Sequence, residues 1–532
     1  MTTKQQQGTH PSFFILIIVF FFWGFLAASN GIFIPFCKAH FNLTQLEAQL
    51  IETAFYGAYY VGSFVLYLLS IAKGYDIMGR IGYKKAIIYG LGVSVIGALI
   101  MIPAINSGSY WFILGAFFVI ALGFSLQQTG AQPFAIALGE PSSGSHRLNM
   151  AGGVNSLGTT LGPLIVSILL FGSVAGAVAA DISKINNLYL ILSGVFVLAI
   201  LVLTFGKLPD GKSDDDSMES SSKATNSLVA MTVMLVVVIL LGMTGIVSKM
   251  TAISLAMVGV LANLTFAYFD SQKNPKGWGA MQYGQLVLGM IAIFVYVGVE
   301  VTIQSNMGLL FAKPEFGSLS ESQIDPYISL YWGSMMVGRW MGGVAVFNLK
   351  GRTRTIANIV VPIVAFAIVL GVNTIKGNDM SNLYSYILCV CMLIGVMFYG
   401  QEKPAKTLLA VSIFGTIAML IGVSTVGTIS IYAFLCGGLC CSVMWPCIFA
   451  LAVSNLGKYT PQASGFLIMM ILGGALIPPF QGGLADTSIG IHASYWVPVA
   501  CFLYTAWYAI KVKSILSAQG IDVENIEGGG GH

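Results

Sequence analysis

The stretch GMIAIFVYVGVEVTIQSNMGLLF, residues 289–311, is one apolar run with a single carboxylate, Glu300, near its middle. A helix that crosses a bilayer needs about 20 mainly apolar residues, so this run is long enough to span a membrane. A charged side chain near the bilayer centre costs about 2.5–3.5 kcal/mol on insertion scales, and such residues mark functional sites by default. We therefore expect the function of the chain to depend on Glu300 and on the helix that carries it.

The composition of the whole chain is that of a polytopic membrane protein. Of its 532 residues, 56% are hydrophobic and 9% are charged, whereas soluble domains carry about 25% charged residues. The net charge of +4 is too small to indicate a nucleic-acid partner. The cysteines between positions 436 and 447 form no CxxC pair and have no histidine nearby, and no GxxxxGK[ST] phosphate loop occurs. We therefore expect no metal and no other cofactor, and ATP-driven chemistry finds no support.

Sixteen apolar runs are candidates for membrane-spanning helices, and the distribution of Lys and Arg gives their direction. With the N-terminus in the cytoplasm, 20 of the 25 Lys and Arg residues fall inside and the other five outside. Cytoplasmic loops carry the excess of these residues, so we expect both termini to be cytoplasmic. The candidate spans lie near residues 12–34, 50–72, 85–105, 110–138, 148–172, 187–206, 227–247, 250–269, 282–312, 325–347, 355–375, 382–399, 406–424, 427–454, 464–485 and 493–513.

A polar segment at residues 207–226, with three adjacent aspartates and a serine run, separates the first six spans from the rest. Adjacent aspartates without a loop scaffold point in different directions, so we interpret this segment as a solvated cytoplasmic linker. A weak repeat crosses it: QPFAIAL at 132–138 and WPCIFAL at 445–451 each end a span. Two similar halves are typical of secondary transporters. We expect the first half to be a six-helix bundle over residues 1–206.

Several motifs occur in an order that points to a family. They are FWGF at 22–25, LIETAFYGAYY at 50–60, GRIGYKK at 79–85, QQTGAQPF at 127–134 and YVGVE at 296–300. Together they resemble the sugar-transporting branch of the major facilitator superfamily that contains the L-fucose/proton symporter. The resemblance implies an all-α fold of two six-helix bundles that rock about a central sugar site.

The family core has twelve spans, so the resemblance makes four of the sixteen extra. We expect one inserted hairpin at 227–269 and another at about 355–399. The second hairpin would lie within a C-terminal bundle over 270–515, followed by a flexible tail at 516–532.

At two positions this chain lacks an acidic residue that the fucose symporter has. The fucose symporter carries an aspartate just after the asparagine of its first helix and a glutamate before the threonine of its fourth. Those positions are Gly31 and Gln128 here, so a coupling route through them cannot be transferred. Glu300 becomes the expected ion-coupling residue, with Glu52, near the outer end of its helix, as a second candidate.

A site for a neutral sugar needs amide and hydroxyl groups to pair its hydroxyls and an aromatic face for its ring. The spans offer amides and aromatic rings for this purpose. For any one amide, the alternative is a hydrogen bond between helices, worth about 0.6 kcal/mol on average. The candidate substrate-binding residues are Asn30, Gln127, Gln128, Gln132, Asn155, Gln304, Asn306, Tyr56 and Trp445.

The loop at 79–85 resembles the cytoplasmic loop that is characteristic of the superfamily. Its basic residues, with others at corresponding positions, are expected to latch the two bundles on the cytoplasmic side. The alternative is the ordinary excess of positive charge on that side. The candidate latch residues are Arg80, Lys84, Lys85, Arg147 and Arg339.

The resemblance implies a monomeric secondary active transporter in a bacterial-type inner membrane, with the lipid bilayer and a small sugar as partners and no enzymatic activity. It would import a fucose-, glucose- or galactose-like hexose with H⁺ coupled through Glu300. Within the same fold, Na⁺ coupling or uncoupled transport are alternatives. A membrane-embedded transferase and a transporter-like sensor are alternatives of other classes.

Overall fold

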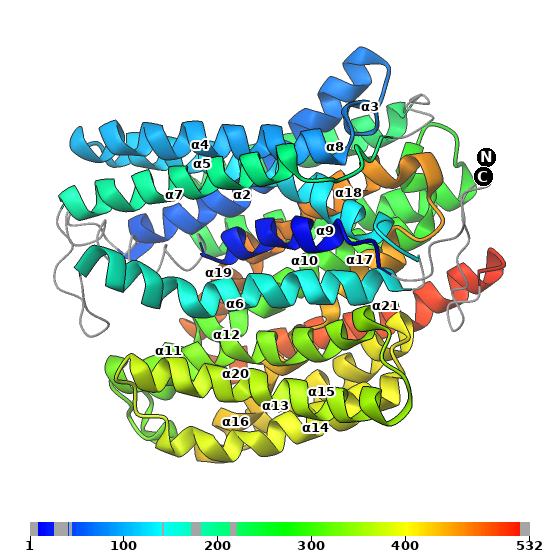
Figure 1. Cartoon of the computed structure of the whole chain (residues 1–532). Helices are drawn as coiled ribbons and strands as arrows, with labels where there is room; N and C mark the ends of the chain where they lie inside the picture. The colour runs from blue at the N-terminus through cyan, green and yellow to red at the C-terminus, as the bar shows by residue number, and fades with distance from the viewer. Residues whose placement is uncertain are drawn as a thin grey trace.

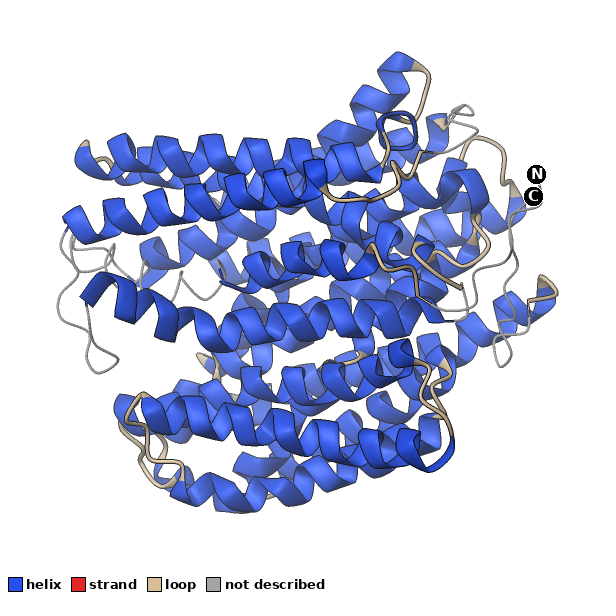
Figure 2. Cartoon of the chain, viewed as in Figure 1, coloured by secondary structure: helices blue, strands red, loops and turns tan. Residues whose placement is uncertain are grey.

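The computed structural model describes residues 9–25, 41, 45–140, 143–171, 182–212 and 221–521, and these are helices joined by loops and turns, with no strand among them (Figure 2). Within this part of the chain, 13 helices are long and apolar enough to cross a membrane, and a further apolar helix covers Ser12–Phe25. The all-α prediction is confirmed. The count of sixteen spans and the cytoplasmic termini stay predictions.

The N-terminal half is built from the helix Ser12–Phe25 and helices α2 to α7, which lie side by side (Figure 1). Helix α4 packs on α5 and α7, and α2 packs on α5. Gly90 and Gly123 permit the close approach of α4 and α5, because a Cβ at Gly123 would meet the Gly90 carbonyl oxygen at 2.5 Å. The helices are α2 (Gln45–Lys73), α3 (Ile77–Ile81), α4 (Tyr83–Asn106), α5 (Tyr110–Ala137), α6 (Gly144–Phe171) and α7 (Ile182–Phe205).

The C-terminal half repeats part of this arrangement, since its α15 packs on α16 and α21 as α4 packs on α5 and α7. At its centre lies α10, which is buried along almost its whole length. The helices are α10 (Gly284–Ser305), α11 (Met307–Phe311), α12 (Glu321–Gly343), α15 (Pro404–Ser424), α16 (Gly427–Cys441), α17 (Met444–Ala452), α18 (Thr460–Met469), α19 (Gly473–Ala485), α20 (Gly490–Ser494) and α21 (Trp496–Ala518). Short 3-10 turns are η2 (Gly279–Gln282), η3 (Pro314–Phe316), η4 (Val344–Phe347), η6 (Gly457–Tyr459) and η7 (Met470–Leu472).

Two further helix pairs flank the halves: α8 (Ser222–Met243) with α9 (Lys249–Lys273), and α13 (Gly351–Ile375) with η5 (Ser381–Tyr386) and α14 (Ile387–Gly400). Helix α8 meets α2 through the hydroxyl pairs Tyr60–Thr232 and Tyr67–Thr225, at 2.7 and 2.9 Å. Helix α9 packs on α10 and α19, whereas α13 packs on α12 and α14 on α15. In the sequence, these pairs cover the residues of the two predicted hairpins. The division into domains stays a prediction.

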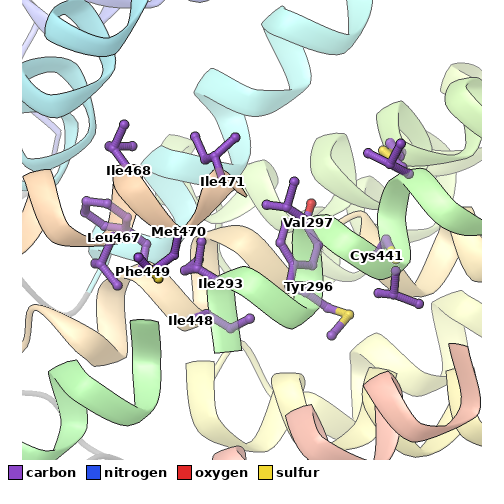
Figure 3. Packing of buried hydrophobic residues seen from close by; sticks show 14 of the residues in the cluster. Ile293, Tyr296, Val297, Cys441, Ile448, Phe449, Leu467, Ile468, Met470 and Ile471 are labelled. Carbon is purple, nitrogen blue, oxygen red and sulfur yellow. The ribbon is translucent and has the colours of Figure 1, made fainter. Parts of the chain in front are cut away.

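The core of the C-terminal half fixes the position of α10. Ile293 and Val297 of α10 lie among side chains of α17, α18 and η7 (Figure 3). The neighbouring Tyr296 is buried in the same cluster. Because such interiors are close-packed, the next turn of α10, with Glu300, is held in a defined place.

We call one end of the helices the basic end, because Lys73, Lys350 and Arg354 lie there, where α2 and α12 end and α13 begins. It is the right-hand side of Figure 1, where α3 is labelled. By the charge distribution, the basic end is the predicted cytoplasmic end.

A substitution at Gly473 tests the packing of α19 on α10. A Cβ at this position would overlap the carbonyl oxygen of Phe294. We expect Gly473→Ala to lower the free energy of unfolding by about 1–3 kcal/mol, the usual cost of overpacking. The control is Gly371→Ala in α13, where a Cβ would meet no described atom within 4 Å and alanine favours the helix. Thermal unfolding in detergent measures both, and equal melting temperatures would contradict the packing.

Candidate functional site

A cavity of about 260 Å³ lies between the two halves, and Glu300 lines it. Its walls come from the helix Ser12–Phe25, α2, α5 and α6 on one side and from α10, α12, α17 and η7 on the other. The lining is mainly apolar and aromatic with a few polar groups, as in small-molecule sites, and the volume lies just below their usual range of about 300–1,000 Å³.

Glu300 forms a largely buried ion pair with Arg339 of α12. Arg339 Nη2 lies 3.3 Å from Glu300 Oε1, and the two side chains are 13% and 14% exposed. Arg339 also donates from Nη1 to Ser156 Oγ at 2.9 Å and from Nε to the Ser442 carbonyl oxygen at 3.1 Å. Since Ser156 belongs to α6, one guanidinium joins the carboxylate of α10 to the opposite half. Charge-assisted bonds of this kind are stronger than neutral ones.

The structure places Arg339 elsewhere than expected, in the central cavity, and its role as a latch stays a prediction. We placed it with the cytoplasmic basic residues, but it lies inside α12 and lines the central cavity. The signal was present in the sequence, since Arg339 follows the apolar run YWGSMMVG. An ionisable residue inside a span faces the bundle interior and has a partner there, and that partner is Glu300.

Five of the nine predicted substrate-binding residues line the cavity: Tyr56, Gln128, Gln132, Asn155 and Trp445. Gln128 Nε2 donates to the Tyr59 hydroxyl at 3.0 Å. Asn155 Nδ2 donates to the carbonyl oxygen of Phe20 at 3.0 Å. The structure therefore brings them together, and their role in binding stays a prediction.

Three other predicted amides lie elsewhere. Gln127 is fully buried, accepts from Trp23 Nε1 at 2.7 Å and donates to Ser94 Oγ at 3.0 Å. Gln304 donates to Ser305 Oγ, and Asn306 donates to the Thr302 carbonyl oxygen. In this conformation all three make hydrogen bonds to the protein outside the cavity, and their role in binding stays a prediction.

Two further predicted residues cannot be placed. Asn30 and the side chain of Glu52 lie outside the part of the chain that the structure describes.

The cavity also contains groups that were not predicted as site residues. Trp332, Tyr59 and Tyr296 add aromatic surface. Trp445 Nε1 is buried and has no hydrogen-bond partner among the described residues. A buried donor without a partner costs about 1–3 kcal/mol, so this edge of the cavity is suited to an acceptor on a bound molecule.

The remaining latch candidates bond mainly within the N-terminal half. Arg147, fully buried, donates to the carbonyl oxygens of Ala135 and Glu140 at 2.7 and 2.8 Å, so it caps the end of α5. Its role as a latch between the halves stays a prediction. Lys84 Nζ donates to the carbonyl oxygen of Gly206 at 3.2 Å.

For Arg80 and Lys85, the role as latch residues stays a prediction. The Arg80 guanidinium lies 4.1 Å from the centre of the Tyr75 ring, and Lys85 is exposed.

Two further hydrogen bonds join described residues of the two halves towards the basic end. Trp340 Nε1 donates to the Gly153 carbonyl oxygen at 3.1 Å. Ser464 Oγ donates to the Thr129 carbonyl oxygen at 2.8 Å. The halves are therefore in contact on the basic side of the cavity.

The sequence model described as Major Facilitator Superfamily matches residues 13–405. The chain belongs to this superfamily. It is 30% identical over 500 residues to the putative glucose/galactose transporter of Helicobacter pylori strain J99, covering 93% of this chain and 95% of that protein. It is 29% identical over 510 residues to the glucose/galactose transporter of Brucella abortus biovar 1, covering 96% and 95%. It is 24% identical over 514 residues to the L-fucose-proton symporter of Escherichia coli K12, covering 94% and 92%.

The fold also matches solved members of the Major Facilitator Superfamily. The crystal structure of the transporter FucP in the outward conformation aligns with a TM-score of 0.66 at 21% identity, covering 94% of this chain and 98% of that one. The predicted resemblance to the branch with the fucose symporter is confirmed. This protein is therefore an integral protein of a bacterial-type inner membrane and belongs to a family of transporters, not enzymes.

Proposed function

We propose that this protein imports a glucose-, galactose- or fucose-like hexose by alternating access, with H⁺ coupled through Glu300. The observation that carries the proposal is the buried Glu300–Arg339 pair, which lines a cavity between two halves and reaches Ser156 across it. The names of the relatives, glucose/galactose transporter and L-fucose-proton symporter, support a sugar as the substrate.

The cavity lining supports recognition of a neutral polyol. Gln128, Gln132 and Asn155 bring amides from the N-terminal half, and Trp445 and Tyr296 bring aromatic faces from the other. Amides pair with hydroxyl groups as donors and as acceptors, while aromatic faces cover the C–H side of a sugar ring. A hexose held between both walls would contact both halves at once.

A proton suits this site better than a sodium ion. Sodium sites are built from several oxygen ligands, in the manner of other hard cations. Here the nearest charged neighbour of the Glu300 carboxylate is the Arg339 guanidinium, at 3.3 Å, which would repel a second cation. A proton needs only the carboxylate itself.

Proton binding would change the forces between the halves. The ionised Glu300 attracts Arg339, which at the same time holds Ser156 of α6. Protonation removes the negative charge, so the guanidinium loses its counter-ion. A ligand shifts a conformational equilibrium by its difference in affinity between the two states, and the proton would do so through this pair.

Uptake of labelled sugars into vesicles tests the proposal. With acid outside, we expect accumulation of glucose, galactose or fucose above equilibrium and its collapse by a protonophore. Accumulation driven by a Na⁺ gradient alone would contradict H⁺ coupling. Equilibration without accumulation would indicate a passive carrier, and no uptake of any hexose would contradict the substrate class.

The variant Trp445→Phe tests whether the indole N–H of Trp445 donates a hydrogen bond to the substrate. The substitution keeps an aromatic face but removes Nε1, which has no protein partner among the described residues. One hydrogen bond is worth about 0.5–1.5 kcal/mol, so we expect the KM for uptake to rise about threefold to tenfold with a smaller change in maximal rate. The control is Trp507→Phe, at an exposed ring of α21. An unchanged KM for Trp445→Phe would remove this residue from the substrate site.

A further inference from the structure

A second cavity, of about 320 Å³, lies nearer the basic end and shares no lining residue with the central cavity. We call it the basic-end cavity. One wall is the first turns of α6, with His146 and Asn149, and the facing walls are α12, α13 and the turn between α14 and α15. It therefore lies between the N-terminal half and the flanking pair α13–α14, along the same two helices, α6 and α12, that line the central cavity.

The basic-end cavity contains a buried acceptor that lacks a donor. Asn149 Oδ1 is buried with no partner among the described residues. In the same wall, His146 Nδ1 lies 3.0 Å from the Gly342 carbonyl oxygen, which can only accept, so Nδ1 carries the proton. The other ring nitrogen, Nε2, lies 3.9 Å from Glu402 Oε2. A buried acceptor without a donor calls for a bound molecule with donor groups.

The other lining groups fit the same kind of molecule. Asn358 and Thr407 are buried amide and hydroxyl groups in its walls, and Phe398 adds an aromatic ring. The charged residue Arg354 is already paired with Glu402 by two hydrogen bonds, so it attracts an anion weakly. Amides, a hydroxyl and an aromatic face are the groups that a neutral sugar requires.

We propose that the basic-end cavity is a second sugar site, filled from the predicted cytoplasmic side. The proposal rests on the proposed function, because the sugar that has been imported is the donor-rich molecule present there. A sugar in this cavity would form hydrogen bonds with α6 in one wall and with α13 in the facing wall. It therefore opposes the separation of the halves at the basic end, and internal sugar slows further import.

Cysteine protection tests this site in the full-length chain. Thr355 lines the basic-end cavity and is exposed, whereas Thr353, two residues away, is exposed and does not line it. In inside-out vesicles, we expect glucose or galactose to slow maleimide labelling of Thr355→Cys at least threefold and to leave Thr353→Cys unchanged. Rates are taken as the increment over the parent protein, because the chain has native cysteines.

Second-site variants separate the two cavities. Asn358→Leu should abolish the protection, while Asn373→Leu should keep it. Asn373 is a buried amide of α13 that bonds within its own helix to Val369. Gln128→Ala, which alters the central cavity, should also keep the protection of Thr355→Cys.

The outcomes are distinguishable from failure of the proposed function. Thr159→Cys, in the central cavity, reports that site from right-side-out vesicles. Protection at Thr159→Cys without protection at Thr355→Cys overturns the second site alone. Loss of the Thr355→Cys protection with Gln128→Ala, or equal protection by inorganic phosphate, also overturns it. No protection at either position, together with no hexose uptake, overturns the proposed function itself.

Discussion

Glu300→Gln is expected to abolish sugar accumulation against a gradient while leaving downhill exchange of labelled sugar. Glutamine keeps the shape and hydrogen bonding of the protonated acid but cannot exchange a proton. With one proton per sugar, a pH difference of one unit supports about tenfold accumulation, since a factor of ten corresponds to about 1.4 kcal/mol. The accumulation ratio in vesicles with acid outside should therefore fall from about tenfold to about one.

Two controls sharpen this experiment. Glu315→Gln removes an exposed carboxylate within η3 and should leave the accumulation ratio unchanged. Counterflow of labelled sugar into sugar-loaded vesicles needs no net proton movement, so it should persist in Glu300→Gln. A Glu300→Gln variant that still accumulates sugar under the pH gradient would show that coupling runs through another group.

Arg339→Gln is expected to cost both stability and transport. It leaves the Glu300 carboxylate buried without its counter-ion and removes the bonds to Ser156 and Ser442. Breaking a buried ion pair by removing one partner costs about 3–5 kcal/mol. We expect a large fall in the melting temperature in detergent, and initial uptake reduced about a hundredfold or more.

The double variant Glu300→Gln/Arg339→Gln separates charge from structure. Removal of both partners leaves no uncompensated charge in the interior, so the melting temperature should recover part of what Arg339→Gln loses. Uphill accumulation should not recover, because no proton-binding carboxylate remains in the pair. Arg352→Gln, at an exposed arginine of α13, is the control for loss of one positive charge. Equal stability of Arg339→Gln and Arg352→Gln would contradict the assigned pair.

The sequence predicted the all-helical fold because hydropathy and span length depend only on local composition. It could not predict which side of each helix faces the cavity. Gln127 and Gln128 are adjacent, yet they point about 100° apart on a helix of 3.6 residues per turn. One bonds Trp23 and Ser94 in the interior of its half, and the other lines the cavity. Because α5 is apolar on nearly every side, its sequence has no polar face that would distinguish the two.

The position of Arg339 in the central cavity was not predicted, for a different reason. Counting every Lys and Arg towards loop charge treats a buried arginine as one more cytoplasmic residue. The packing of α12 against α6 and α10, which brings Arg339 to Glu300 and Ser156, depends on contacts between segments far apart in the chain. Span prediction contains no such information.

The pair α8–α9 has a mechanical consequence. Its two helices are tied to each other by Ser227 and Asn263, at 2.8 and 3.1 Å, and α9 continues through η2 into α10. The pair should thus travel with the C-terminal half as one rigid piece. Its tyrosine–threonine contacts to α2 are neutral hydroxyl bonds of about 0.6 kcal/mol each, cheap to break and remake. Helix α2 would therefore slide along α8 at little cost in free energy when one half moves relative to the other.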